Sequence, residues 1–189
     1  MTGFPPAGAA AEVTAAAILV DERTDVDRLL GDIAREQQAA GRRVCGLLMT
    51  YPSPEKSCAG DMVLLDIETR ERYLVSQRLG PGSQACRADT QGFARASQVL
   101  RRAVHSDPDL VICNRFGALE AEGEGFAAEL LELMSNGVPL LTAVARRHFD
   151  AWKRFSGEAP VLTGRDEVGA WLARRLAGAG LQPDRPGTT

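Results

Sequence analysis

Lysine is nearly missing from this sequence: Lys56 and Lys153 are the only two among 189 residues, whereas arginine is abundant. An excess of positive charge is missing as well, since the formal net charge is −3 and the pI is about 5.5. A protein that binds nucleic acid through phosphate contacts needs a basic face. The composition therefore excludes that class of protein.

The sequence contains no pair of cysteines at C-x-x-C spacing, which argues against a structural zinc site. The four cysteines stand singly, at Cys45, Cys58, Cys86 and Cys113. Cys45 and Cys113 lie inside apolar runs, so we expect them in the core, whereas Cys58 and Cys86 lie in expected loops.

A secretory or membrane-spanning segment is not apparent. The apolar stretch 7–20 is short, contains Glu12 and follows no positively charged region. We therefore expect a cytoplasmic protein with reduced thiols and no membrane contact.

Familiar catalytic patterns are absent too. The sequence has no H-E-x-x-H motif, no Ser-His-Asp order and no defensible pair of carboxylates. His105 and His148 are isolated, and each is expected to be a surface or capped residue. We predict no catalytic residue, no metal site and no cofactor, and we lean against an enzyme.

What the sequence does have is an alternation of apolar runs and helical periodicity. Strands are expected at 14–20, 44–50, 110–113, 138–144 and 161–162, and helices at 26–40, 93–105, 126–134, 148–155 and 166–176. Segments 61–68 and 72–76 flank a polar turn and predict a β-hairpin. The pattern predicts a three-layer α/β/α sandwich with a mostly parallel sheet and a β-hairpin insertion. One domain is expected over 13–178, between a disordered tail at 1–12 and a polar tail at 179–189.

The first strand–helix junction, at 21–27, lacks the glycines and lysine of a phosphate-binding loop. It carries four carboxylates instead, on Asp21, Glu22, Asp25 and Asp27. These charges complement the dipole of the following helix and would repel a polyphosphate. Hydrolysis of ATP or GTP by the usual P-loop mechanism is therefore not expected, and a solvated turn with an N-cap is favoured over a metal site.

The loop at 114–125 directly follows the expected strand 110–113, so it should lie at the carboxyl edge of the sheet, where α/β proteins bind ligands. Arg115 could bind an anion or form a salt bridge with Glu120 or Glu122, and Asn114 could fix the loop. Gly117 would allow a backbone turn, and Glu120 could orient a nearby arginine. For Phe116, packing on the next helix is favoured over a role in the pocket wall.

The loop at 80–92 also opens a helix. Ser83, Arg87 and the backbone amides at a helix N-terminus would suit a tetrahedral oxyanion. The alternative is a surface loop in which Asp89 or Thr90 caps the helix. Cys86 could be a soft ligand or a reactive thiol, although a simple loop thiol is favoured.

The segment from Asp109 to Glu120, with the helix and the VPLLTAV strand that follow it, resembles the Walker B region of a small family of P-loop nucleoside-triphosphatases. Gly117 and Glu120 match that family by position. Asn114 and Arg115 stand where the family has an acidic pair, which puts the magnesium-holding carboxylate in doubt.

The chain more closely resembles an uncharacterised bacterial "domain of unknown function" family, itself similar to a P-loop nucleoside-triphosphatase with a degenerate Walker A region. The resemblance covers about residues 15–175 and rests on three motifs: Cys86, Arg87 and Asp89; the N-R-F-G-x-x-E-x-x-G loop at 114–123; and Trp152 with Phe155. Genes of that family often lie near molybdate-uptake or molybdoenzyme genes, so the resemblance implies an oxyanion or molybdenum link.

Three functions remain open at this point. The first is a non-catalytic binding protein for a small oxyanion such as molybdate. The second is a nucleotide-binding enzyme with a non-standard phosphate site, and the third is a regulator that binds a protein partner of a transport or cofactor pathway. Homo-oligomerisation also remains open. The predicted ligand-binding residues are Ser83, Cys86, Arg87, Asp89, Asn114, Arg115, Gly117 and Glu120.

Overall fold

The computed structural model describes residues 13–21, 24–51, 62–78 and 86–177, except for the side chains of residues 77, 78, 86 and 87. The expected tails at 1–12 and 179–189 lie outside this part of the chain. The strands are β1 Ala15–Val20, β2 Val44–Thr50, β3 Val63–Asp66, β4 Arg72–Leu74, β5 Ser76–Arg78, β6 Cys86–Ala88, β7 Leu110–Phe116, β8 Leu140–Ala145 and β9 Val161–Leu162. The helices are α1 Val26–Ala39, α2 Thr90–Val104, α3 Ala118–Ala121, α4 Ala127–Ser135, η1 Arg146–His148, α5 Phe149–Ser156 and α6 Gly164–Leu176.

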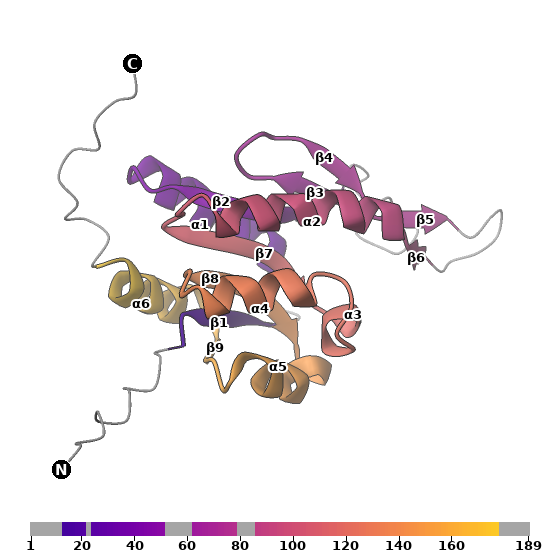
Figure 1. Cartoon of the computed structure of the whole chain (residues 1–189). Coiled ribbons are helices and arrows are strands. Elements are labelled where there is room, and N and C mark those ends of the chain that lie inside the picture. The colour runs from indigo at the N-terminus through magenta and orange to yellow at the C-terminus, as the bar shows by residue number, and fades with distance from the viewer. Residues whose placement is uncertain (1–12, 22–23, 52–61, 79–85, 178–189) are drawn as a thin grey trace, which may run out of the picture.

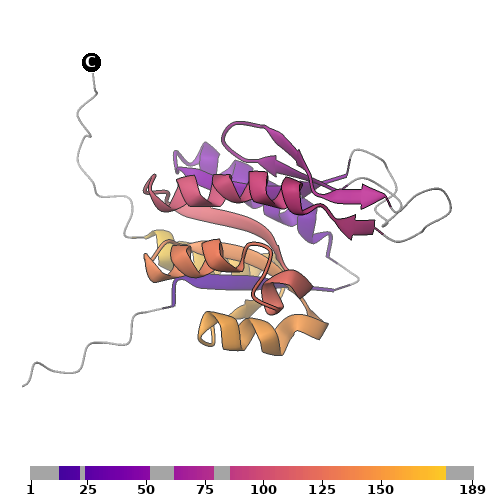
Figure 2. The ribbon, with the colours of Figure 1, turned by 45° about the vertical axis from the view of Figure 1, so that its right-hand side comes forward.

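The main sheet has the strand order β4-β3-β2-β7-β8-β1-β9, and it is parallel from β2 to β9 (Figures 1 and 2). Side chains alternate between its two faces. Leu110 and Ile112 of β7 pack with α1 and α6, whereas Val111 and Cys113 pack with α2, α4 and α5. The predicted three-layer α/β/α sandwich is confirmed, and it is consistent with a P-loop-NTPase-like fold.

Helix α1 shows how local sequence places an element. Asp25 is its N-cap, and the Asp25 side chain accepts a hydrogen bond from the backbone N–H of Arg28 at 3.2 Å. Residues at helical spacing, including Leu29, Leu30 and Ile33, are buried against the sheet. Gly41, with φ of +79°, follows the helix end.

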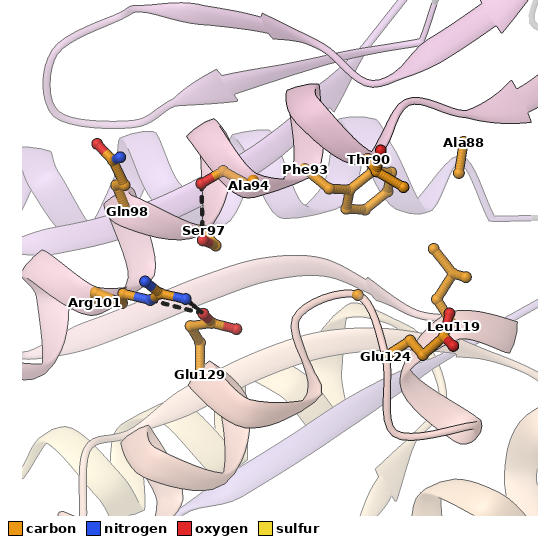
Figure 3. Close-up of a pocket in the computed structure, with 11 residues that line it drawn as sticks. Ala88, Thr90, Phe93, Ala94, Ser97, Gln98, Arg101, Leu119, Glu124 and Glu129 are labelled. Atoms are coloured by element: carbon orange, nitrogen blue, oxygen red, sulfur yellow. Dashed lines mark hydrogen bonds and ion pairs between the residues drawn. The ribbon is translucent and has the colours of Figure 1, made fainter.

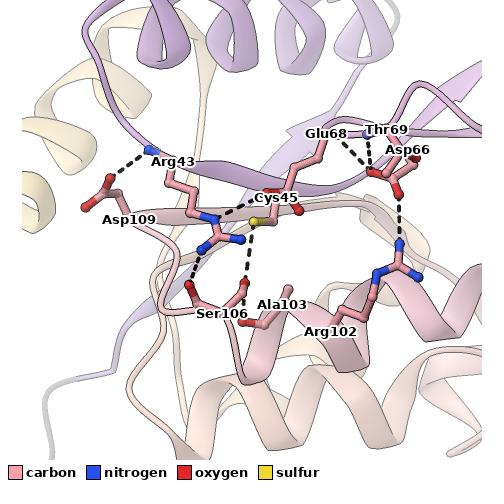
Figure 4. A network of polar contacts seen from close by, with 9 residues as sticks. All are labelled: Arg43, Cys45, Asp66, Glu68, Thr69, Arg102, Ala103, Ser106 and Asp109. Atoms are coloured by element: carbon pink, nitrogen blue, oxygen red, sulfur yellow. Dashed lines mark hydrogen bonds and ion pairs between the residues drawn. The ribbon is translucent and has the colours of Figure 1, made fainter. Parts of the chain in front are cut away.

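The predicted hairpin is confirmed: β3 and β4 pair antiparallel, and β4 is the edge strand. Asp66, which is fully buried, holds its turn, because one oxygen accepts the backbone N–H of Glu68 and Thr69 at 2.9 and 3.3 Å. The other Asp66 oxygen pairs with Arg102 of α2 at 2.9 Å (Figure 4). This contact fixes the hairpin to the helix that packs on the sheet.

Two loop expectations need correction. The strand expected to end at Cys113 continues to Phe116, with a register irregularity between these residues. The loop expected over 80–92 contains strand β6, and α2 already begins at Thr90, because Asp89 caps it. In both places polar residues are part of a strand or helix, and hydrophobic periodicity alone does not predict such elements.

Within the described ranges, no helix combines the length and the apolar character that crossing a lipid bilayer demands.

The two cysteines expected in the core, Cys45 and Cys113, are both buried free thiols, which confirms the expectation. Burial and the neighbouring Glu68 carboxylate raise the pKa of Cys45 to about 11 (Figure 4). Burial also raises the pKa of Cys113 well above its usual value, with smaller contributions from Glu120 and Glu129.

These thiols are expected not to react in the folded protein. At pH 8 a thiol with a pKa near 11 is a thiolate in about one molecule per thousand, and only the thiolate is nucleophilic. In a Cys58→Ser/Cys86→Ser variant, a maleimide should label neither remaining cysteine in buffer and both in urea. Rapid labelling in buffer at pH 8 would contradict the buried, protonated state.

Candidate functional site

The sheet has a topological switch point between β1 and β8, as the connections that follow these two strands show. The connection after β1 runs through α1 toward β2 on one face, whereas the connection after β8 runs through α5 toward β9 on the other face. In open α/β sheets, ligands bind at the carboxyl ends of the strands beside such a point. The ends of β1, β7 and β8 are therefore the first place to look for a site.

In the described part of the junction after β1, two carboxylates accept hydrogen bonds from neighbouring backbone N–H groups. The Asp21 side chain accepts the backbone N–H of Thr24 at 2.7 Å, and Asp25 caps α1. Asp27 adds a third acidic side chain in the first helical turn. A phosphate at this helix start would meet carboxylates in place of amide donors.

At the end of β7, Asn114 and Arg115 both contact Asp27 of α1. Asn114 is 3% exposed, and its Nδ2 donates to Asp27 Oδ1 at 3.0 Å. Arg115 Nη2 lies 3.4 Å from Asp27 Oδ2, and the Arg115 side chain is 44% exposed. Arg115 forms a salt bridge, as the second alternative predicted. Its partner is Asp27, however, and not Glu120 or Glu122.

Further basic residues follow β8, the neighbour of β7. Arg146, Arg147 and His148 form η1, with both arginines exposed, and Arg147 Nε donates to His148 Nε2 at 3.1 Å. The sequence prediction missed these arginines. They could have been found from the sequence, because they come directly after an apolar run, as Asn114 and Arg115 do after residues 110–113. Since β7 and β8 are parallel neighbours, both sets lie at one edge.

Glu120 shapes the loop after β7. It is 5% exposed, and its two oxygens accept the backbone N–H of Gly117 at 2.9 Å and of Phe126 at 3.1 Å. Gly117 is the N-cap of α3. Gly125 has φ of +58°, and a Cβ there would lie 2.2 Å from Glu120 Oε1. The Glu120 carboxylate thus orders the loop backbone, and it does not contact Arg115.

The other predicted segment is described in part. Ser83 lies outside the described residues, and so do the side chains of Cys86 and Arg87, whose backbones belong to β6. Asp89 caps α2 by accepting the backbone N–H of Gln91 at 3.1 Å, as the capping alternative predicted. That Arg87 and Arg115 share one pocket stays a prediction.

Phe116 packs and does not line an open pocket. It is 1% exposed, and its ring centroid lies 5.3 Å from that of Trp152 and 5.0 Å from that of Phe155. Both partners belong to α5, so Phe116 packs as expected, but on α5 and not on the next helix along the chain. This aromatic cluster fixes the end of β7 and, with it, the backbone that carries Asn114 and Arg115.

Comparison with known proteins gives one family and one curated relative. The relative is "Molybdenum import ATP-binding protein ModC 2" of Bradyrhizobium diazoefficiens, which is 35% identical over 158 residues. The match covers 82% of this chain but 18% of the relative's length. No solved structure matches the chain. Residues 15–171 match the family described as "Protein of unknown function (DUF2478)", and the chain belongs to that family.

Proposed function

We propose that this protein binds a small oxyanion, such as molybdate, at the carboxyl edge of its sheet and does not hydrolyse nucleotides. One observation carries the proposal: guanidinium groups follow two adjacent parallel strands beside the switch point, Arg115 on β7 and Arg146 with Arg147 after β8. Guanidinium groups present several N–H donors in a fixed plane, which suits the oxygens of a tetrahedral anion.

Asp27 sets the affinity of this site. Its carboxylate already holds Arg115, so an incoming oxyanion competes with it for the guanidinium. The contact is long and the arginine is half-exposed, and such ion pairs contribute little free energy. Arg115 can therefore exchange Asp27 for a dianion. Removal of the Asp27 charge is expected to strengthen anion binding.

Molybdate is the first ligand to test because the relative is named for molybdenum import. This chain matches a small share of that relative, so the assignment concerns a module and not the relative's whole activity. The module would act as an accessory of molybdenum handling, with a transport or cofactor-pathway protein as its partner. A nucleotide-binding enzyme is disfavoured by the carboxylates around the start of α1.

The test is thermal unfolding with molybdate, tungstate, sulfate, phosphate and ATP with magnesium. An anion at about 100 times its dissociation constant should stabilise the protein by roughly 2.7 kcal/mol. Arg115→Ala should abolish the stabilisation, and Asp27→Asn should increase it. Arg174→Ala, an exposed arginine in the last turn of α6, is the matched control and should behave as the unchanged protein.

Three results would contradict the proposal. One is an absence of stabilisation by every oxyanion, which would favour the partner-binding alternative. Another is an equal shift in the Arg115→Ala and Arg174→Ala variants, which would place the anion elsewhere. The third is stabilisation by ATP with magnesium-dependent phosphate release, which would restore the enzyme hypothesis.

A further inference from the structure

A cavity of about 560 Å³ lies between α2 and the loop that joins α3 to α4 (Figure 3). Its size is in the range of small-molecule sites. Phe93 and Ala94 of α2 form one wall, and Leu119 of α3 with Gly125 of the following loop forms the other. The cavity does not include the Asp27, Asn114 and Arg115 cluster.

One end of the cavity contains a buried carboxylate with an unused oxygen. Glu129 of α4 is 4% exposed, and its Oε1 accepts from both Nε and Nη2 of Arg101, at 2.9 and 2.8 Å. In the described part of the chain, Glu129 Oε2 has no donor, and Figure 3 shows it directed away from Arg101 toward the loop. Glu129 Oε2 is not one of the buried atoms without a partner, so it is accessible from the cavity, where a ligand that donates a hydrogen bond can reach it.

The other end of the cavity has a second carboxylate. Glu124 of the loop lies on the side of Thr90, away from Glu129 (Figure 3). Among the described residues, Glu124 forms no ion pair. Arg101 supplies one positive charge and the two glutamates supply two negative charges, so the cavity lining carries a net charge of −1. The lining is thus complementary to a cation.

The walls between the two carboxylates are largely apolar. The Phe93 ring is held by the Phe126 ring, with 5.1 Å between centroids, and Leu119 faces it from α3. The Ser97 hydroxyl donates to the Ala94 carbonyl at 3.0 Å, which leaves its oxygen able to accept. The cavity therefore offers acceptors at both ends and hydrocarbon in the middle.

We infer that this cavity binds a linear aliphatic diamine or polyamine. One ammonium group donates to Glu129 Oε2, the methylene chain lies between Phe93 and Leu119, and the second ammonium group pairs with Glu124. Ammonium groups carry three donors and strong charge, and aliphatic chains gain from contact with apolar walls. The aromatic ring adds attraction for a cation near its face.

The inference is tested by calorimetric titration at low salt with putrescine, cadaverine and spermidine. Butylamine, which has one ammonium group, and 1,4-butanediol, which has none, are the ligand controls. The diamines should bind about threefold to tenfold more tightly than butylamine, and butanediol should not bind. Equal affinity for butylamine and the diamines would overturn the assignment of two carboxylates.

Variants separate this cavity from general attraction of cations to an acidic protein. Glu129→Gln should weaken diamine binding about tenfold or more because the buried carboxylate is lost, and Glu124→Gln should weaken it about threefold. Glu132→Gln, the same change at an exposed position of α4, is the matched control and should have no effect.

Ala94→Phe provides a test that leaves the Arg101–Glu129 ion pair intact. Ala94 is exposed on α2, so the larger ring fills the cavity without entering the core, and diamine binding should be lost. Retained affinity in the Ala94→Phe and Glu129→Gln variants, or no binding of any diamine, would overturn the inference. The Arg115→Ala variant should bind diamines normally, so the outcome is independent of the oxyanion proposal.

Discussion

Replacing Glu120 by alanine is expected to lower the free energy of unfolding by about 3 to 5 kcal/mol. The carboxylate, which is 5% exposed, accepts the backbone N–H groups of Gly117 and Phe126. A hydrogen bond to a charged group contributes about 1.5 to 3 kcal/mol, and its loss leaves a donor without a partner. Alanine removes both bonds together.

Urea unfolding measures this effect, with Glu122→Ala as the control. Glu122 is exposed at the C-cap of α3, so its replacement should change stability by less than about 0.5 kcal/mol. Glu120→Gln should give an intermediate loss, because the glutamine side chain has one carbonyl acceptor in place of two carboxylate oxygens. If Glu120→Ala and Glu122→Ala unfold at the same urea concentration, the loop does not depend on Glu120.

The layers of the fold were predictable because they depend on local patterns. The apolar run at 44–50 and the helical spacing at 26–40 each reflect burial of one element against the sheet, and the structure confirms both elements. The hairpin was predictable for the same reason, since the polar turn at 69–71 separates two apolar segments. Strand order was not predictable, because it depends on which strands pair across the sheet.

The partner of the site arginine was not predictable from sequence. Asp27 stands 88 residues before Arg115, and it is one of four carboxylates in a segment that fits a solvated turn. Its selection depends on α1 starting beside the end of β7. Pairwise contacts of this kind follow from the tertiary arrangement of elements, and no local periodicity records them.

The burial of Glu129, the carboxylate in the cavity, was not predictable for a different reason. A glutamate on an amphipathic helix normally faces solvent, so Glu129 gave no sign that it is buried. Its burial follows from the ion pair with Arg101, which lies 28 residues earlier on α2. Both residues look like ordinary surface charges until the two helices are placed side by side.

Gly46→Ala is expected to destabilise the protein by about 4 kcal/mol or more, and to reduce the soluble yield. Gly46 lies within β2 with φ of +117°, and a Cβ at this position would lie 2.0 Å from the carbonyl oxygen of Ile112 in β7. The Cβ would be fixed to the backbone of β2 and the oxygen belongs to the backbone of β7, so neither can move away without separating the two strands. This close approach was not predictable from the sequence, because a glycine in an apolar run fits an ordinary buried strand.

Thermal and urea unfolding of Gly46→Ala should be compared with those of Gly31→Ala, the same change on α1. A Cβ at Gly31 meets only the flexible end of Arg35, at 3.7 Å, and alanine favours a helix over glycine by about 0.5 to 1 kcal/mol. The two substitutions should therefore shift the unfolding midpoint in opposite directions. If the Gly46→Ala variant unfolds at the same midpoint as the unchanged protein, β2 and β7 tolerate a side chain between them. The close pairing of these strands, which positions the edge that carries Asn114 and Arg115, would then be wrong.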